Sequence, residues 1–211
     1  MKSFDLSVYL VLDPDLCGEV GMVETARRAA LSGATMVQLR HKAASSAEMT
    51  ALGLALMDAL AGTGAKLIVN DDVAAAMACG AHGVHVGQGD MATEKARALI
   101  GPDMILGLSV ETPARAAAAD PALVDYVGAG PVFATITKTD HEPAVGFEGL
   151  AAQVAATDIP AVAIGGVKAS HAKAVIDAGA EGLAVVSAIC GQADIEKATQ
   201  QIVDAVRKAK I

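Results

Sequence analysis

Two acidic residues, Asp71 and Asp90, each follow a short apolar run with the composition of a β-strand, at residues 67–69 and 84–86. The alanine-rich segment between the runs, residues 73–80, is typical of a helix that ends at glycine. Strand, helix and strand in succession form a parallel crossover, which places both aspartates at the same mouth. Two carboxylates facing one cavity repel each other unless a cation lies between them, and Mg²⁺ commonly binds one or two carboxylates together with substrate phosphates.

These aspartates also have a purely structural interpretation, in which Asp71 caps the helix that follows it and Asp90 caps the next helix along the chain. The stretch that contains them leaves both interpretations open. The residue types at the other strand ends bear on the choice, because a metal site for phosphates needs further polar and basic groups nearby.

The same alternation of apolar runs and helical segments continues along the whole chain. Strands are expected at residues 8–12, 36–39, 67–69, 84–86, 104–108, 124–127, 161–164 and 182–186. Helices are expected at residues 20–32, 45–61, 73–80, 93–100, 112–119, 147–156, 170–178 and 193–210. Eight such units in 211 residues, with no linker, predict one α/β domain over residues 1–211, a (β/α)₈ TIM barrel. An open doubly wound sheet is the alternative, but the turn after the first strand, DPDLCGEV, lacks its glycine-rich fingerprint.

Composition limits the classes of function. The net charge of −8 and the aromatic content of 2% disfavour binding along a phosphate backbone or by base stacking, so we expect no nucleic-acid partner. The N-terminal apolar stretch is too short for a secretory or membrane segment. Three cysteines without metal or redox spacing indicate a reducing compartment, so we expect a cytoplasmic protein without a membrane partner.

Basic residues also follow the expected strands. In barrels of this kind the chemistry lies at the C-terminal ends of the strands, so Arg40, Lys42 and Lys138 should share the mouth with the aspartates. Arginine offers phosphate oxygens a fixed fork and lysine a point charge. With a cation between Asp71 and Asp90, these bases would surround a diphosphate; the alternative is ordinary solvated surface charge.

A second group of residues predicts a separate phosphate site. Gly165 and Gly166 follow the seventh expected strand, and Val186 and Ser187 follow the eighth. Loops at these two positions recur as phosphate sites in barrels, where glycine lets backbone N–H groups approach the phosphate closely. Two anion sites, one of them for a diphosphate, predict transfer of a group with pyrophosphate as the leaving group.

Seven motifs, in order along nearly the whole chain, resemble the thiamine phosphate synthase family. They are QLRHK at 38–42, ND at 70–71, HVGQGD at 85–90, GLSV at 107–110, TITK at 135–138, IGGV at 164–167 and VVSAI at 185–189. The resemblance implies a (β/α)₈ transferase that joins a hydroxymethylpyrimidine diphosphate to a thiazole phosphate, which is either the plain or the carboxylated form. The products would be thiamine phosphate and pyrophosphate, with Mg²⁺ as cofactor and a largely dissociative mechanism.

The resemblance also implies residue roles. The residues implied to hold the pyrimidine diphosphate are Gln38, Leu39, Arg40, His41, Lys42, Asn70, Ser109 and Lys138. Of these, the residues implied to act in catalysis are Arg40, Lys42, Ser109 and Lys138. The residues implied to hold the thiazole phosphate are Thr135, Ile136, Thr137, Gly166, Val186 and Ser187, and those implied to bind Mg²⁺ are Asp71 and Asp90. The partners are then two phosphorylated small molecules, and homo-oligomer formation stays open. The family loop usually carries prolines where this chain has Ala134 and Ile136, which bears on the order and closing of that loop.

Two other functions compete with the transferase. A thiazole tautomerase on the same barrel would keep the thiazole phosphate site but would need neither the diphosphate residues nor the metal pair. A non-catalytic barrel that binds a phosphorylated ligand as a regulator would gain little from a clamp for a leaving group. The joint presence of the acidic pair and the three bases favours the transferase.

Overall fold

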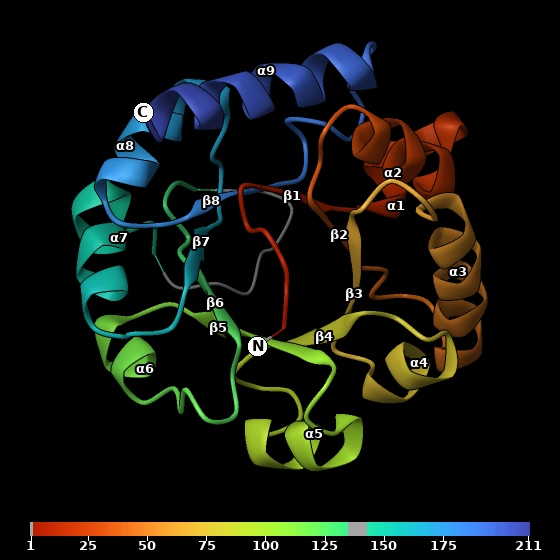
Figure 1. The fold of residues 1–211 in the computed structure, drawn as a ribbon, viewed down its shortest axis with the longest axis horizontal. Coiled ribbons are helices and arrows are strands. Elements are labelled where there is room, and N and C mark those ends of the chain that lie inside the picture. Colours follow the sequence, from red (N-terminus) through yellow and green to blue (C-terminus); the bar gives the residue numbers. More distant parts are fainter. Residues whose placement is uncertain (1, 135–142) are drawn as a thin grey trace.

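Eight short strands close into a parallel barrel in the computed structural model, which describes residues 2–134 and 143–211 (Figure 1). The strands are β1 (Val8–Val11), β2 (Met36–Leu39), β3 (Lys66–Asn70), β4 (Gly83–Val86), β5 (Ile105–Val110), β6 (Tyr126–Ala129), β7 (Ala161–Ala163) and β8 (Gly182–Val185). Each strand pairs with the next in sequence, and β8 pairs with β1 to complete the circle. The prediction of a (β/α)₈ barrel is confirmed.

Helices surround the barrel and cover the outer face of its strands (Figure 1). They are α1 (Pro14–Cys17), η1 (Gly18–Val20), α2 (Met22–Leu31), α3 (Ser46–Ala59), α4 (Val73–Ala78), α5 (Thr93–Ile100), α6 (Pro113–Ala117), α7 (Gly146–Ala155), η2 (Ala169–His171), α8 (Ala172–Asp177) and α9 (Ile195–Ala209). Two details differ from the sequence analysis. The segment expected as a turn after β1 contains α1 and η1, because Asp13 caps α1 by accepting from the backbone N–H of Leu16 at 3.0 Å. The helix expected at residues 170–178 is divided between η2 and α8.

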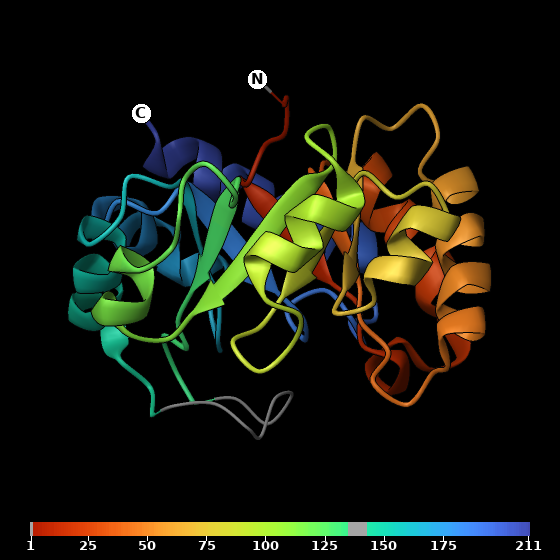
Figure 2. The same ribbon diagram turned by 90° about the horizontal axis from the view of Figure 1, so that it is seen from below.

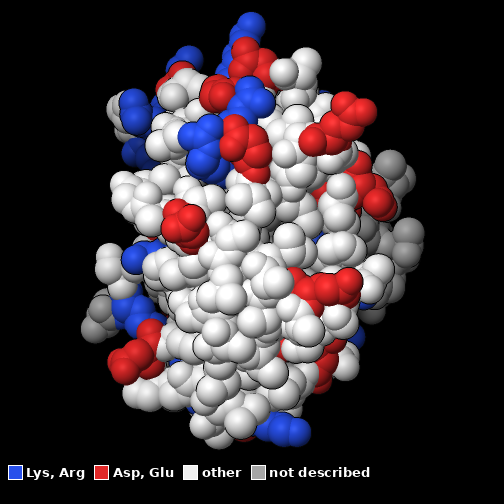
Figure 3. Space-filling view, turned by 90° about the vertical axis from the view of Figure 1, so that its right-hand side faces the viewer, with Lys and Arg blue, Asp and Glu red and all other residues white. Residues whose placement is uncertain are grey.

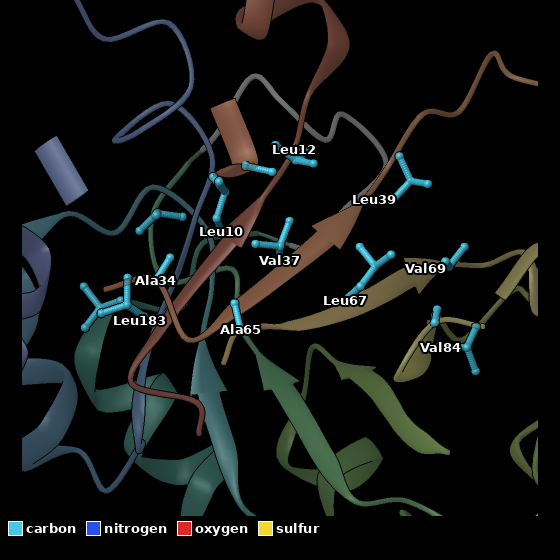
Figure 4. Close-up of a cluster of buried hydrophobic side chains, with 14 of the residues drawn as sticks. Leu10, Leu12, Ala34, Val37, Leu39, Ala65, Leu67, Val69, Val84 and Leu183 are labelled. Atoms are coloured by element: carbon cyan, nitrogen blue, oxygen red, sulfur yellow. The ribbon is translucent and has the colours of Figure 1, made fainter. Parts of the chain in front are cut away.

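The strands are buried on both faces. Side chains that point outward, such as Leu10, Val37 and Leu67, pack in a layer between barrel and helices (Figure 4). Their neighbours in sequence, such as Tyr9 and Met36, fill the inside of the barrel. Because both faces are covered, the strands consist mostly of consecutive apolar residues. These apolar runs are the feature of the sequence from which the strands were predicted.

The two ends of the barrel differ. The N-terminal segment lies at the end where the strands begin, at the upper edge of Figure 2. Phe4 and Leu6 pack into the barrel interior there, and the ring of Phe4 lies 6.0 Å from that of Tyr126, measured between centroids. This end is therefore filled by apolar side chains, and polar groups concentrate at the other end.

The outer surface is mixed in charge. On the face in Figure 3, acidic and basic side chains are interspersed and the centre is largely uncharged. This face shows no continuous basic surface. Within the described ranges, none of the helices has both the length and the apolar character needed to cross a bilayer.

The cysteines are arranged in a way that their spacing in sequence did not predict. Cys17 and Cys190 are both buried, and their Sγ atoms lie 3.7 Å apart although 173 positions separate them. Closure of the barrel explains this contact, because β1 and β8 are neighbours and so are the loops that follow them. The third cysteine, Cys79, is buried beneath α3, next to Gly53.

Candidate functional site

A cavity of about 970 Å³ opens at the C-terminal ends of the strands. Its lining includes ten residues from the sequence prediction: Gln38, Arg40, Lys42, Asn70, Asp71, Asp90, Ser109, Gly166, Val186 and Ser187. These residues follow or end six different strands, so the fold brings together positions that are far apart in the chain. The expectation that chemistry-bearing residues share one mouth is met for these ten.

The remaining predicted site residues are not part of this lining. Leu39 is fully buried and points into the layer between barrel and helices (Figure 4), because Gln38 before it points into the barrel. Only the backbone of Leu39 is thus positioned to contact a ligand. His41 is partly buried and is not among the lining residues. The predicted residues of the loop after β6, namely Thr135, Ile136, Thr137 and Lys138, lie outside the described residues, and their roles stay predictions.

Asp71 has an unusual backbone conformation. Among the described residues it is the one non-glycine residue in the left-handed region, with φ of 63°. Its backbone N–H donates to the carbonyl oxygen of His85 at 2.8 Å, and its carboxylate accepts from Nδ2 of Asn70 at 2.5 Å. Such strain costs on the order of 1 kcal/mol and persists where surrounding contacts enforce it, as at ligand sites. These contacts aim the carboxylate at the cavity.

Helix capping does not explain either aspartate. The residue that caps α4 is Asp72, whose carboxylate accepts from the backbone N–H of Ala75 at 2.8 Å. Helix α5 begins after Ala92 and has no side-chain cap, while the carboxylate of Asp90 accepts from the N–H of Gly87 at 2.8 Å. The interpretation of Asp71 and Asp90 as caps of the helices that follow them is therefore wrong.

The two carboxylates interact with each other. Burial, followed by hydrogen bonding and repulsion from Asp90, raises the pKa of Asp71 to about 7, although Lys42 and Arg40 act in the opposite direction. Burial and Asp90 together outweigh the two bases, so the carboxyl of Asp71 keeps its proton to a higher pH than an exposed aspartate does. Oxygen donors from two carboxylates fit a hard cation such as Mg²⁺, whose other ligands are usually water and phosphate. Within residues 2–134 and 143–211, no group of three or more His, Cys, Asp or Glu is arranged for a metal, so protein ligands alone would not complete such a site.

The opposite side of the cavity is built from backbone. Gly165 and Gly166 have φ of 96° and 64°, which is the region that favours glycine. A Cβ on Gly166 would lie 2.9 Å from the Cβ of Phe133, so the space there is also limited. After β8, Val186 and Ser187 begin a turn in which the carbonyl of Val186 accepts from the N–H groups of residues 189 and 190. β3 and β7 lie four places apart in a circle of eight strands, so this backbone-lined half faces the acidic pair across the barrel.

Several lining residues were missed or left undecided by sequence reasoning. Glu111 and Arg115 line the cavity and form an ion pair at 2.5 Å, and Lys168 lies beside the glycine pair. The direction of His85 was open; the structure shows it inside the barrel, between outward-facing Val84 and Val86. Side chains alternate between the two faces of a strand. The outward direction of Val84 and Val86 would therefore have predicted that His85 points into the barrel.

A closed parallel barrel, with charged groups on one side of its mouth and glycine backbone on the other, defines a (β/α)₈ enzyme with a site suited to anionic small molecules. The family model described as thiamine monophosphate synthase matches residues 8–189. The chain belongs to this family and is a transferase.

Individual relatives agree with this assignment. A thiamine-phosphate synthase of Xanthobacter autotrophicus is 47% identical over 99% of this chain and 99% of its own length. One from Azorhizobium caulinodans is 46% identical, with 94% of each chain covered. The solved structure of a thiamine phosphate pyrophosphorylase from Pyrococcus furiosus superposes with a TM-score of 0.87 at 37% identity, covering 97% of this chain and 96% of the other. The resemblance seen in the seven motifs is confirmed.

Proposed function

We propose that this chain is a Mg²⁺-dependent thiamine phosphate synthase, which joins a hydroxymethylpyrimidine diphosphate to a thiazole phosphate and releases pyrophosphate. The observation that carries the proposal is the division of the cavity into two unlike halves. One half, the charged half, comprises Arg40, Lys42, Asn70, Asp71 and Asp90. The other, the backbone half, comprises the glycine pair with Val186 and Ser187.

The charged half suits a diphosphate. Asp71 and Asp90 would hold Mg²⁺; their proximity supports this, because Asp90 adds to the effect of burial in raising the pKa of Asp71. When bound there, Mg²⁺ would offset the negative charge that develops on the leaving pyrophosphate. Arg40 and Lys42 line the same half and would bind the phosphate oxygens, with Lys138 from the loop after β6 as a further cation in the proposal.

The backbone half suits a phosphomonoester. Positive φ at Gly166 leaves the backbone uncovered by a side chain, so a phosphate can approach its N–H groups. The turn that starts at Ser187 adds a second set of backbone donors from the neighbouring strand end. A thiazole phosphate anchored here would place its ring over the barrel centre, facing the diphosphate substrate.

The reaction needs little acid or base chemistry. The bond between the pyrimidine methylene carbon and the diphosphate oxygen breaks, and its electron pair leaves with pyrophosphate. The thiazole ring nitrogen then supplies the electron pair for the new carbon–nitrogen bond, so no proton has to be removed. Cations fixed around the leaving group stabilise the transition state most, because the charge grows there during bond breaking.

The two alternatives account for less of the cavity. A thiazole tautomerase would use only the backbone half, and a regulatory binder would have no need of strain at Asp71. The charged half costs stability, since burial and repulsion from Asp90 disfavour the ionised form of Asp71. A cost of this kind is usual where a site serves catalysis.

The test is a coupled assay of pyrophosphate release with both substrates, with and without Mg²⁺. We expect release only when all three components are present, in equal amount to thiamine phosphate. The control variant is Asp58→Asn on the exposed face of α3, which should retain full activity. Release from the pyrimidine diphosphate alone, or no requirement for a divalent cation, would contradict the proposal.

A further inference from the structure

A continuous path of hydrogen bonds crosses the inside of the barrel beneath the cavity. Gln38 Nε2 lies 2.8 Å from Tyr9 Oη, and Tyr9 Oη lies 2.8 Å from Tyr126 Oη. Tyr126 Oη lies 2.9 Å from His85 Nδ1, and His85 Nε2 lies 2.9 Å from Ser109 Oγ. The path therefore joins two lining residues on different strands, Gln38 on β2 and Ser109 on β5, through three further side chains.

The three connecting residues, which we call the relay, are Tyr9, Tyr126 and His85. Their side chains are buried, since Tyr126 is 0% exposed, Tyr9 1% and His85 7%, and Tyr9 and His85 also line the cavity. Burial raises the pKa of both phenols, so each keeps one hydrogen at neutral pH. Each phenol can then donate to one relay neighbour and accept from the other.

With a neutral imidazole at His85, this constraint gives the path only two directions. In the first, Gln38 donates to Tyr9, Tyr9 to Tyr126, Tyr126 to His85 Nδ1, and His85 Nε2 to Ser109. In the second, every donor and acceptor is exchanged, which also reverses the amide of Gln38. If one bond within the path reversed and the others did not, two donors or two acceptors would face each other. An unsatisfied polar contact between buried groups costs free energy, so the bonds reverse together or not at all.

The direction of the path fixes what each end offers to a ligand. With Gln38 Nε2 donating into the path, as its position in the structure has it, its Oε1 is left as an acceptor. The hydroxyl of Ser109, having accepted from His85, then has its own hydrogen to donate. The two ends are thus complementary: one accepts while the other donates.

We propose that the relay of Tyr9, Tyr126 and His85 positions Gln38 and Ser109 as a coupled pair that selects an aminopyrimidine over its oxo analogue. An aminopyrimidine offers an exocyclic N–H to Gln38 and a ring nitrogen to Ser109. The oxo form has an oxygen and a ring N–H instead, so it matches only if all the bonds of the path reverse together. This inference rests on the proposed function and adds the residues that set its substrate choice.

The test compares the amino and oxo forms of the pyrimidine diphosphate in wild type and in Tyr126→Phe. Phenylalanine fills nearly the same volume but removes the central hydroxyl, so Gln38 can reverse its amide without the rest of the path. We expect the ratio of kcat/KM for the amino form over the oxo form to fall at least about tenfold. The KM for the thiazole phosphate should be unchanged.

Two further variants separate positioning from simple loss of stability. Tyr9→Phe removes the bonds of Tyr9 to Gln38 and to Tyr126 and should lower the same ratio. Ile105→Val trims a side chain in the same buried cluster but removes no polar atom of the path, so it should lower the melting temperature and leave the ratio unchanged. If Tyr126→Phe keeps the ratio within about twofold while its melting temperature falls, the residues of the relay are structural and the inference is wrong.

A binding measurement distinguishes failure of this inference from failure of the proposed function. The free amino and oxo hydroxymethylpyrimidines are titrated into the wild type and Tyr126→Phe, which requires no turnover. A preference for the amino form that is lost in the variant supports the relay even if the enzyme assay fails. Equal preference in both proteins overturns the relay even if the assay succeeds.

Discussion

The two halves of the cavity bind anions by different physical means. The charged half uses side-chain charge and contains the strained Asp71, whereas the backbone half uses glycine conformation and the turn at Ser187. A side-chain charge can be removed with little change in shape, but a glycine with positive φ cannot be replaced without strain. Substitutions in the charged half should therefore change chemistry with the fold retained, while those in the backbone half should change chemistry and also strain the fold.

The largest effect is expected for Asp71→Asn. Asparagine tolerates the left-handed backbone, so the fold should be retained while one of the two carboxylates is lost. We expect kcat to fall on the order of 10³-fold, with weaker dependence on Mg²⁺ concentration. Steady-state kinetics across a Mg²⁺ titration, with a melting curve, measures both. An unchanged Mg²⁺ dependence would remove Asp71 from the metal site.

Lys138→Ala should have the next largest effect. A cation that meets the leaving group as charge develops affects turnover more than binding, so kcat should fall about 10²-fold. The KM for the pyrimidine diphosphate and the melting temperature should hardly move, because a loop lysine seldom contributes much to stability. If kcat is retained while the melting temperature drops, Lys138 is structural.

Gly166→Ala tests the backbone half. The KM for the thiazole phosphate should rise about tenfold, because a Cβ 2.9 Å from the Cβ of Phe133 would force the backbone at Gly166, and with it the donors for the phosphate, to shift. The matched control is Gly80→Ala, since Gly80 has φ of 67° and lies away from the cavity. Gly80→Ala should lose on the order of 1 kcal/mol of stability from backbone strain alone, and Gly166→Ala should lose more because its Cβ also meets Phe133, but only Gly166→Ala should change a KM. A rise in KM for both substrates alike would argue against two separate halves.

The smallest effect concerns pH and the stability of the metal-free protein. The pKa of Asp71 is raised from 3.8 to about 7, so the folded state binds this proton more tightly than the unfolded state. Its contribution to stability is therefore full below pH 3.8 and is lost as pH rises through about 7. We expect melting temperatures of wild type to decline over this range more than those of Asp71→Asn. Added Mg²⁺ should reduce the difference near pH 8; identical pH profiles would contradict the assigned interaction with Asp90.

The fold and much of the site could be predicted from sequence because parallel strands have a simple geometry. Asp71 and Asp90 follow consecutive strands, so their placement at one mouth required only the strand assignment. The short helix α1 was missed because four residues are too few to show helical periodicity, although Asp13 and Pro14 carry its capping signal.

The relay could not be predicted for a different reason. β1 is buried on both faces, so its sequence VYLV does not reveal which side chains point inward. The contact between Tyr9 and Tyr126 joins residues 117 positions apart, and only closure of the barrel determines it. The contact of Cys17 with Cys190 has the same origin. Leu39 was predicted as a site residue because it lies within the motif QLRHK. Its position in the motif did not reveal that its side chain points away from the cavity.

The measurement that tests the central claim most directly is a crossed calorimetric titration. Pyrophosphate with Mg²⁺, and separately thiazole phosphate, are titrated into wild type, Asp71→Asn and Gly166→Ala. If the cavity has two independent halves, Asp71→Asn weakens only pyrophosphate binding and Gly166→Ala weakens only thiazole phosphate binding, each by about tenfold or more. If each variant weakens both ligands equally, the division of the cavity, and with it the proposed reaction, is wrong.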